Sequence, residues 1–216
     1  MPTTTDDQPD APASTRRRAL LITLFSISAV VLVLDQVSKA WAISSLVEGE
    51  RRDLVGDLLG LQLVFNPGAA LSIATGMTWL LTIVAAAVIV VVVRASRRIG
   101  SRAWAVALGL LLGGALGNLV DRLVREPGIA RGHVVDFIAY ADWFVGNVAD
   151  IAIVSAAVLV VILAARGVHI DGTRDGQQQP ETDDESATDP ADLDQDAAAP
   201  TAATAVAPPT STEQNA

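Results

Sequence analysis

The sequence predicts an all-α membrane protein with four transmembrane helices, and three observations support this fold class. Hydrophobic residues make up 51% of the 216 residues, which is high for a soluble domain. They are concentrated in uncharged runs of a length typical of membrane spans. Arginines flank these runs at alternating ends. The four runs are residues 19–34, 77–93, 103–120 and 151–165.

Each run is somewhat shorter than the ~20 residues that a helix needs to cross a bilayer. Each helix should therefore continue past its run and carry polar residues at one end. Asp35 follows the first run, and Asp150 precedes the fourth.

The arginines predict the orientation of the helices, because short cytoplasmic flanks are enriched in Lys and Arg. They precede the first run, separate the second from the third and follow the fourth, at Arg16, Arg17, Arg18, Arg94, Arg97, Arg98, Arg102 and Arg166. With four crossings, all these flanks and both termini are predicted to be cytoplasmic. The loops after the first and third runs are then extracytoplasmic.

A cleaved signal peptide is an alternative interpretation of the first run. A basic start, an apolar stretch and the small residues Ala40 and Ala42 fit it. However, the apolar stretch is longer than the usual ~7–15 residues. Asp35 and Lys39 also put charge where a cleavage region is normally uncharged.

The net charge of −9 comes from the two ends of the chain, whereas the part between them is mildly basic. Both ends lack apolar periodicity and are rich in Asp, Pro, Thr and Ala, which is typical of disordered segments. We predict a disordered N-terminal tail at residues 1–15, a four-helix transmembrane domain at 16–167 and a disordered acidic tail at 168–216.

The amino-acid composition also excludes several kinds of catalytic and metal site. The chain has no cysteine, which excludes disulfides, a thiol nucleophile and thiolate metal sites. Its only two histidines, His133 and His169, make a zinc cluster improbable. The composition therefore gives no sign of a thiolate or zinc site, and we expect no nucleic-acid partner.

Unusual polar residues gather at the predicted extracytoplasmic boundary of the membrane. They are Asp35, Gln36, Lys39, Asn66, Asn118, Asp121, Arg122, Asp136, Asn147 and Asp150. Ionisable groups at membrane depth are costly unless paired or hydrated, so they point to a functional site. Asp35 and Lys39 are spaced i, i+4 and can form an ion pair. Asp121 and Arg122 point in different directions, so each needs another partner and serves in part as scaffold.

Asp136 and Asp150 differ from the others because neither has a basic residue close in sequence. Two carboxylates in a poorly solvated place cannot both ionise, so one pKa rises and the pair shares a proton. Such a pair can hydrolyse a peptide bond: the ionised acid takes a proton from water, and the protonated acid stabilises the carbonyl oxygen. Asp142, in contrast, is predicted to be a surface charge in a turn or a short interfacial helix.

At these residues the chain resembles lipoprotein signal peptidase, the signal peptidase II family of bacterial membrane aspartic peptidases. The resemblance covers the region from Ala19 to about Arg166. Its motifs are "DQVSKAW" from Asp35, "FNPGAALS" from Phe65, "GGALGNLVDR" from Gly113, "GHVVDFI" from Gly132 and "GNVADIAI" from Gly146.

The resemblance implies an endopeptidase that cleaves diacylglyceryl-modified prolipoproteins before the lipidated cysteine, without a cofactor. It implies that Asp136 and Asp150 are catalytic. The implied supporting and substrate-binding residues are Asp35, Lys39, Asn66, Gly117, Asn118, Asp121, Arg122, Asn147 and Ala149. It also implies a β-rich cradle from the first extracytoplasmic loop and a short interfacial helix from the second.

The expected partners are lipidated prolipoproteins and membrane lipid, in the plasma membrane of a bacterial cell, and a monomer suffices. Two positions depart from the family pattern: Gly146 precedes Asn147 where Phe is common, and Leu71 follows "GAA" where Phe is common. Both concern packing and leave the carboxylates intact. The small residues at 109–118 either let helices approach closely or leave room for the signal-peptide helix.

Three other functions remain as alternatives. A serine–lysine peptidase could use Ser38 or Ser72 with Lys39, but Asp35 one turn away favours charged lysine. A transporter or channel subunit would place acids near the midplane of the helices, whereas here they lie at one end. A structural membrane protein would have no cleavage activity.

Overall fold

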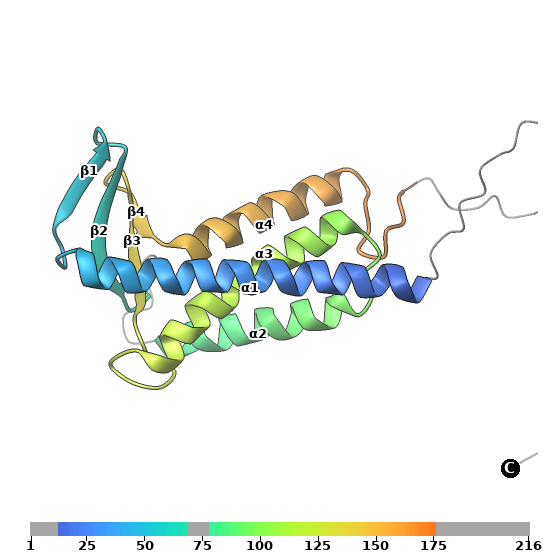
Figure 1. Cartoon of the computed structure of the whole chain (residues 1–216), viewed down its shortest axis with the longest axis horizontal. Helices are drawn as coiled ribbons and strands as arrows, with labels where there is room; N and C mark the ends of the chain where they lie inside the picture. Colours follow the sequence, from blue (N-terminus) through green and yellow to red (C-terminus); the bar gives the residue numbers. More distant parts are fainter. Residues whose placement is uncertain (1–12, 69–77, 176–216) are drawn as a thin grey trace, which may run out of the picture. The chain divides into compact units, whose positions relative to one another are not determined.

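The computed structural model describes residues 13–68 and 78–175. Within them, four helices are long and apolar enough to cross a membrane. These are α1 (Ala13–Ser45), α2 (Thr78–Ser96), α3 (Arg102–Val124) and α4 (Val148–Ala165). The predicted number of spans is confirmed, and each helix extends past its apolar run. Figure 1 shows the helices side by side, with a sheet at one end of the bundle, here called the sheet end.

Helix α3 is the centre of the bundle, because it packs against the other three helices. Glycines on two of its faces allow this close packing. A Cβ atom at Gly113 would lie 2.8 Å from the carbonyl oxygen of Ser28 on α1. One at Gly114 would lie 2.6 Å from the carbonyl oxygen of Ala149 on α4. Of the two interpretations of this small-residue segment, the structure therefore supports close helix packing.

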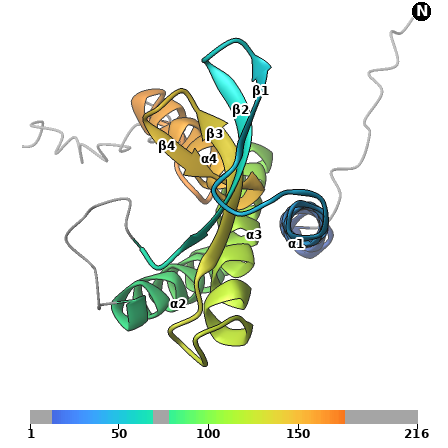
Figure 2. The same cartoon turned by 90° about the vertical axis from the view of Figure 1, so that its left-hand side faces the viewer.

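The sheet combines two loops that are far apart in sequence. Strands β1 (Arg51–Val55) and β2 (Leu59–Asn66) come from the loop between α1 and α2. Strands β3 (Val134–Tyr140) and β4 (Phe144–Gly146) come from the loop between α3 and α4. All pairs are antiparallel in the order β1-β2-β3-β4. Figure 2, viewed from the sheet end, shows the strands lying across the ends of the helices.

A small apolar core attaches the sheet to the last turns of α1. It consists of Ala42, Leu46, Leu63, Val135 and Phe137. Strand β3 is buried along most of its length, as expected for a strand with neighbours on both edges and a helix beneath it. The expected β-rich cradle is therefore present, and it is built from both loops rather than from the first alone.

The short helix expected in the second loop is absent from residues 125–147, all of which the structure describes. Residues 125–133 form turns, and β3 and β4 follow them. The β-branched and aromatic residues of "VVDFIAY" explain the difference, because they favour a strand that can pair with β2.

Ordered structure extends beyond the predicted boundaries of both tails. Helix α1 already begins at Ala13, within the segment that was expected to be disordered. Residues 168–175 form a turn after α4, in which the backbone N–H of Gly100 donates to the carbonyl oxygen of Ile170 at 2.8 Å. Leu71 and Ser72 lie outside the described residues.

Candidate active site

Asp136 lies on β3, opposite Val64 of β2, and its side chain is buried in the sheet end of the bundle. Two amide groups bind its carboxyl. Asn66 Nδ2 donates to Oδ2 at 2.7 Å, and Asn147 Nδ2 donates to Oδ1 at 2.6 Å. Burial raises the pKa of Asp136 to about 6, although the hydrogen bond from Asn66 opposes this rise. The nearby negative charge of Asp150 raises the pKa of Asp136 further.

Asp150 lies in the first turn of α4, and a capping box fixes its carboxylate. Asn147 Oδ1 accepts from the Asp150 N–H at 3.0 Å, and Asp150 Oδ2 accepts from the Asn147 N–H at 3.1 Å. The other carboxylate oxygen, Oδ1, accepts from Asn118 Nδ2 at 3.0 Å. Both carboxylate oxygens of Asp150 are therefore held by hydrogen bonds at the start of α4.

Asn147 links the two aspartates. Its side chain is fully buried, donates to Asp136 through Nδ2 and caps the helix that carries Asp150. The same Nδ2 lies 3.3 Å from Asn118 Oδ1, which connects it to the second amide that binds Asp150. The structure therefore brings Asp136 and Asp150 into one hydrogen-bonded cluster, as the sequence predicts.

A buried ionic network lies beside this cluster, with Lys39 at its centre. Lys39 Nζ lies 2.8 Å from Asp35 Oδ2 and 2.8 Å from Asp121 Oδ2, and all three side chains are fully buried. It also donates to Asn118 Oδ1 at 3.1 Å. The predicted i, i+4 pair of Asp35 and Lys39 is confirmed, and Asp121 has the additional partner that it was expected to need.

The network holds the backbone directly before each aspartate. Asp35 Oδ1 accepts from the N–H of Ala149, which precedes Asp150, at 2.9 Å. Asp121 Oδ2 accepts from the N–H of Val135, which precedes Asp136, at 3.2 Å. Since Lys39 joins both carboxylates, one ammonium group connects the two segments that carry the acids.

Gly117 and Ala149 provide the space for this arrangement. A Cβ atom at Gly117 would lie 2.5 Å from Asp35 Oδ2 and 3.3 Å from the Cβ atom of Ala149. Ala149 is itself fully buried. Small side chains at both positions therefore let α3 and α4 enclose the Asp35 carboxylate.

Arg122 differs from the other supporting residues. Its guanidinium is buried, and Nη1 has no hydrogen-bond partner among the residues that the structure describes. Asp136, Asp121 and Asp150 all interact electrostatically with it. A buried donor without a partner is costly, so this nitrogen is a candidate contact for a bound substrate.

Comparison with known proteins agrees with this geometry. The sequence pattern of signal peptidase II matches residues 27–166, which include α3, α4, strands β2 and β3 and the part of α1 that carries Asp35 and Lys39. The chain belongs to the signal peptidase II family. It is therefore a protease by family, and its four apolar helices make it a multi-pass membrane protein.

Individual relatives cover most of the chain. The lipoprotein signal peptidase of Rhodococcus jostii is 51% identical over 171 residues, or 79% of this chain and 85% of that protein. The lipoprotein signal peptidase of Mycobacterium tuberculosis H37Rv is 48% identical over 164 residues, or 76% and 80%. A solved bacterial membrane enzyme superposes with a TM-score of 0.59 at 27% identity, covering 66% of this chain and 87% of that one.

In this member of the signal peptidase II family, the sequence did not predict the contacts of two residues in the network. Arg125 Nε binds Asp121 Oδ1 at 2.6 Å, and the i, i+4 spacing of the two residues could have revealed it. Gln36 Nε2 donates to Asp35 Oδ2 at 3.1 Å and to the carbonyl oxygen of Gly117 at 3.1 Å. Gln36 was noted at this boundary, but a partner on α3 could not be inferred from spacing.

Asp142 stands apart from the site, as predicted. Its side chain is 98% exposed and pairs with Arg51 Nη1 at 3.1 Å on the surface of the sheet. Among residues 13–68 and 78–175, no group of three or more His, Cys, Asp or Glu side chains has the geometry to hold a metal ion.

Proposed function

We propose that this protein is an aspartic endopeptidase that removes the signal peptide from diacylglyceryl-modified prolipoproteins, cleaving before the lipidated cysteine. The observation that carries this proposal is the cluster in which Asn147 connects Asp136 to Asp150 at the end of a membrane-spanning bundle. Family membership supports the substrate class, because the relatives are lipoprotein signal peptidases.

Asp136 and Asp150 share one proton in the free enzyme, and Asp136 holds it. Burial raises the pKa of Asp136, and the Asp150 carboxylate accepts hydrogen bonds from Asn118 Nδ2 and from the Asn147 N–H. Asp150 removes a proton from the attacking water. Asp136 donates a hydrogen bond to the carbonyl oxygen of the scissile bond and stabilises the negative charge that develops there.

The tetrahedral intermediate collapses when the C–N bond breaks and the amine of the cysteine takes the proton that Asp150 removed from water. Arg122 Nη1 supplies a buried donor for a carbonyl group of the substrate beside the dyad. The supporting residues Asp35, Lys39, Asn118 and Asp121 hold the two acids at the correct separation.

The position of the site fits a lipid-anchored substrate. We infer that the sheet end is extracytoplasmic and both termini are cytoplasmic, in the plasma membrane of a bacterium, because the arginines gather at the opposite end. A cysteine whose acyl chains remain in the outer leaflet then presents its peptide bond at the depth of Asp136.

Substitution of the two acids tests the mechanism. Asp136→Asn and Asp150→Asn should each lower cleavage of a purified diacylated prolipoprotein by at least about hundredfold, because each removes one acid–base partner. Cleavage would be followed by the mass of the released mature lipoprotein. Near wild-type turnover by either folded variant would overturn the dyad.

Ser38→Ala separates this mechanism from a serine–lysine peptidase. Ser38 Oγ already donates to the carbonyl oxygen of Asp35 at 2.9 Å, and the Lys39 ammonium is already paired with two carboxylates at 2.8 Å. The variant should therefore keep wild-type cleavage, whereas a serine nucleophile would make it inactive.

Orientation can be tested separately, since the chain has no cysteine. An impermeant thiol reagent added to intact cells should label Asp142→Cys on the sheet and leave Arg17→Cys on α1 unlabelled. The reverse pattern would refute the proposed topology, but it would not bear on the catalytic roles of Asp136 and Asp150.

A further inference from the structure

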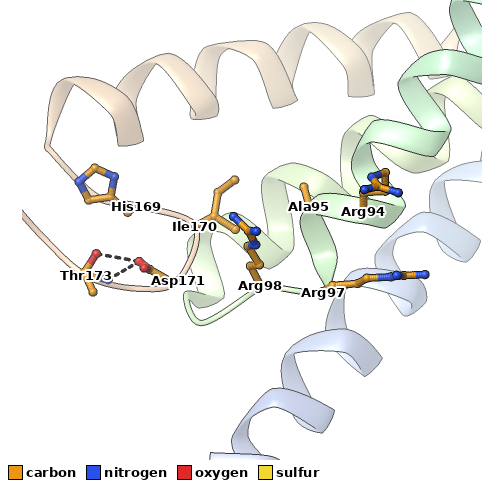
Figure 3. A pocket seen from close by; sticks show the side chains of 8 residues that line it. All are labelled: Arg94, Ala95, Arg97, Arg98, His169, Ile170, Asp171 and Thr173. Carbon is orange, nitrogen blue, oxygen red and sulfur yellow. Dashed lines mark hydrogen bonds between the residues drawn. The ribbon is translucent and has the colours of Figure 1, made fainter.

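The end of the bundle opposite the sheet contains a cavity of about 820 Å³. One wall is the last turn of α2 and the residues after it, with Arg94, Arg97 and Arg98. The other wall is the turn after α4, with His169 and Asp171. Figure 3 shows Arg98 beside Ile170 of this turn, with Arg94 and Arg97 farther from it.

The three arginines have no partner within the cavity. Across residues 13–68 and 78–175, no hydrogen bond or ion pair engages the guanidinium groups of Arg94, Arg97 or Arg98. The cavity therefore presents several cationic donors to a molecule that enters it.

The acid in the cavity is already engaged. Asp171 Oδ1 accepts from the Thr173 hydroxyl at 2.7 Å and from the Thr173 N–H at 3.0 Å, as Figure 3 shows. His169 Nε2 lies 2.8 Å from Asp175 Oδ1, so this ring nitrogen already has a partner within the same turn. The cavity is therefore lined by three arginines and by one carboxylate that its own turn already binds.

The turn after α4 is a fixed wall of the cavity. The indole N–H of Trp104 on α3 donates to the carbonyl oxygen of Val168 at 2.8 Å. The N–H of Gly100 donates to Ile170, and Gly100 packs so closely on Asp171 that a Cβ atom would collide with its backbone. Arginines at this end would be expected from the orientation of the helices in the membrane alone. That role does not explain why the turn after α4 is fixed opposite them.

The cavity lies at the ends of two helices that are long and apolar enough to span a membrane. Helix α2 ends at Ser96 and α4 ends at Ala165, so in the topology proposed above both walls begin where lipid headgroups are expected. Guanidinium groups bind phosphate oxygens in pairs of parallel hydrogen bonds. Basic pockets beside transmembrane helices are known to bind anionic headgroups, and the cytoplasmic leaflet is rich in anionic lipid.

We propose that this cavity binds the phosphate group of an anionic phospholipid, with Arg98 as its main ligand. Arg94 and Arg97 add positive charge at the rim. The bound lipid would tie the ends of α2 and α4 together, because its headgroup contacts both walls. It would therefore stabilise the bundle at the end that has no sheet.

Charge-matched pairs of substitutions test the proposal. The full-length protein, purified in detergent, would be incubated with phosphatidylglycerol or with phosphatidylcholine of the same acyl chains. Native mass spectrometry would count the lipids retained. The test pair is Arg97→Gln with Arg98→Gln. The control pair is Arg17→Gln with Arg18→Gln, which removes the same charge from the same end but lines no part of the cavity.

We expect the wild type and the control pair to retain one phosphatidylglycerol and to release phosphatidylcholine. The test pair should bind phosphatidylglycerol at least about fivefold more weakly for each arginine removed. Inorganic phosphate at equal ionic strength should compete only at far higher concentration, because the site uses the lipid rather than the free anion.

Three outcomes would overturn the proposal. The first is equal weakening in both pairs, which would show a general surface attraction. The second is equal retention of the two lipids by the wild type. The third is displacement by inorganic phosphate at concentrations similar to those of the lipid, which would show that a free anion is the ligand. Circular dichroism of both pairs would establish that each is folded.

Discussion

Charged side chains lie in different environments at the two ends of the helical bundle. At the sheet end, Asp35, Lys39 and Asp121 are fully buried and lie in ion pairs of 2.8 Å. At the opposite end, Arg94, Arg97 and Arg98 are exposed, without an ion-pair partner in the part of the chain that the structure describes. Removing a charge from water costs several kcal/mol unless it is well paired. The buried charges at the sheet end therefore need partners of opposite charge, whereas the exposed arginines do not.

The difference shows what the sheet contributes. Strand β3 packs on the ends of α1 and α3, binds Asp121 through the Val135 N–H and brings Asp136 to Asn147 at the start of α4. Without such a cover, the same acids would be hydrated, and burial would no longer raise the pKa of Asp136. The following predictions test the comparison, beginning with the largest expected effect.

Lys39→Met should be the most damaging single change to stability. It would leave the buried carboxylates of Asp35 and Asp121 without their shared cation, which typically costs about 3–5 kcal/mol. We expect a large fall in the thermal unfolding midpoint in detergent, followed by tryptophan fluorescence, together with loss of cleavage.

Arg17→Met is the matched control, because it removes an exposed cation from the opposite end. Its unfolding midpoint should stay close to that of the wild type. Similar midpoints for the two variants would mean that the buried network does not stabilise the sheet end.

Gly117→Ala and Gly109→Ala should distinguish an effect on the active site from an effect on helix packing. A methyl group at Gly117 would lie 2.5 Å from Asp35 Oδ2, the carboxylate that positions Ala149. We expect a loss of at least about tenfold in kcat/KM, because displacements of about 1 Å at a catalytic group are costly.

A methyl group at Gly109 would lie 2.8 Å from the carbonyl oxygen of Leu24, nearer the middle of the bundle. This variant should unfold at a lower temperature while its folded fraction keeps nearly normal kcat/KM. Equal loss of kcat/KM in both variants would show that helix spacing in general, rather than the Asp35 contact, sets the activity.

Asn66→Ala should change the pH dependence of cleavage. The hydrogen bond from Asn66 favours ionised Asp136 and so lowers a pKa that burial has raised to about 6. If Asp136 must be protonated to act, kcat/KM falls as pH rises through this pKa. Loss of the hydrogen bond raises the pKa of Asp136, so the falling limb should move to higher pH.

Gln62→Ala controls for a general disturbance of β2, because Gln62 donates to Gly49 rather than to the site. Its falling limb should coincide with that of the wild type. A limb that moves to lower pH in Asn66→Ala would contradict the assignment of the shared proton to Asp136.

Much of this arrangement could be predicted from sequence, and the exceptions have physical causes. Four apolar runs predict four spans, and helical spacing predicts the ion pair of Asp35 with Lys39, because both are local properties. The pairing of Val64 with Asp136 is not local, since it joins strands from different loops. Sequence spacing also cannot show which buried amide faces which acid, so the bridging position of Asn147 required the structure.

Asp142→Asn should have the smallest effect, and it sharpens the comparison within a single loop. Asp142 and Asp136 are six positions apart, yet one carboxylate is 98% exposed and the other is buried. An exposed ion pair such as that of Asp142 with Arg51 contributes little to stability, so cleavage should stay within about twofold of wild type. Asp136→Asn, made in parallel, should be inactive. A large loss in Asp142→Asn would mean that exposure does not separate surface acids from catalytic ones here, and the role of burial in this site would have to be reassessed.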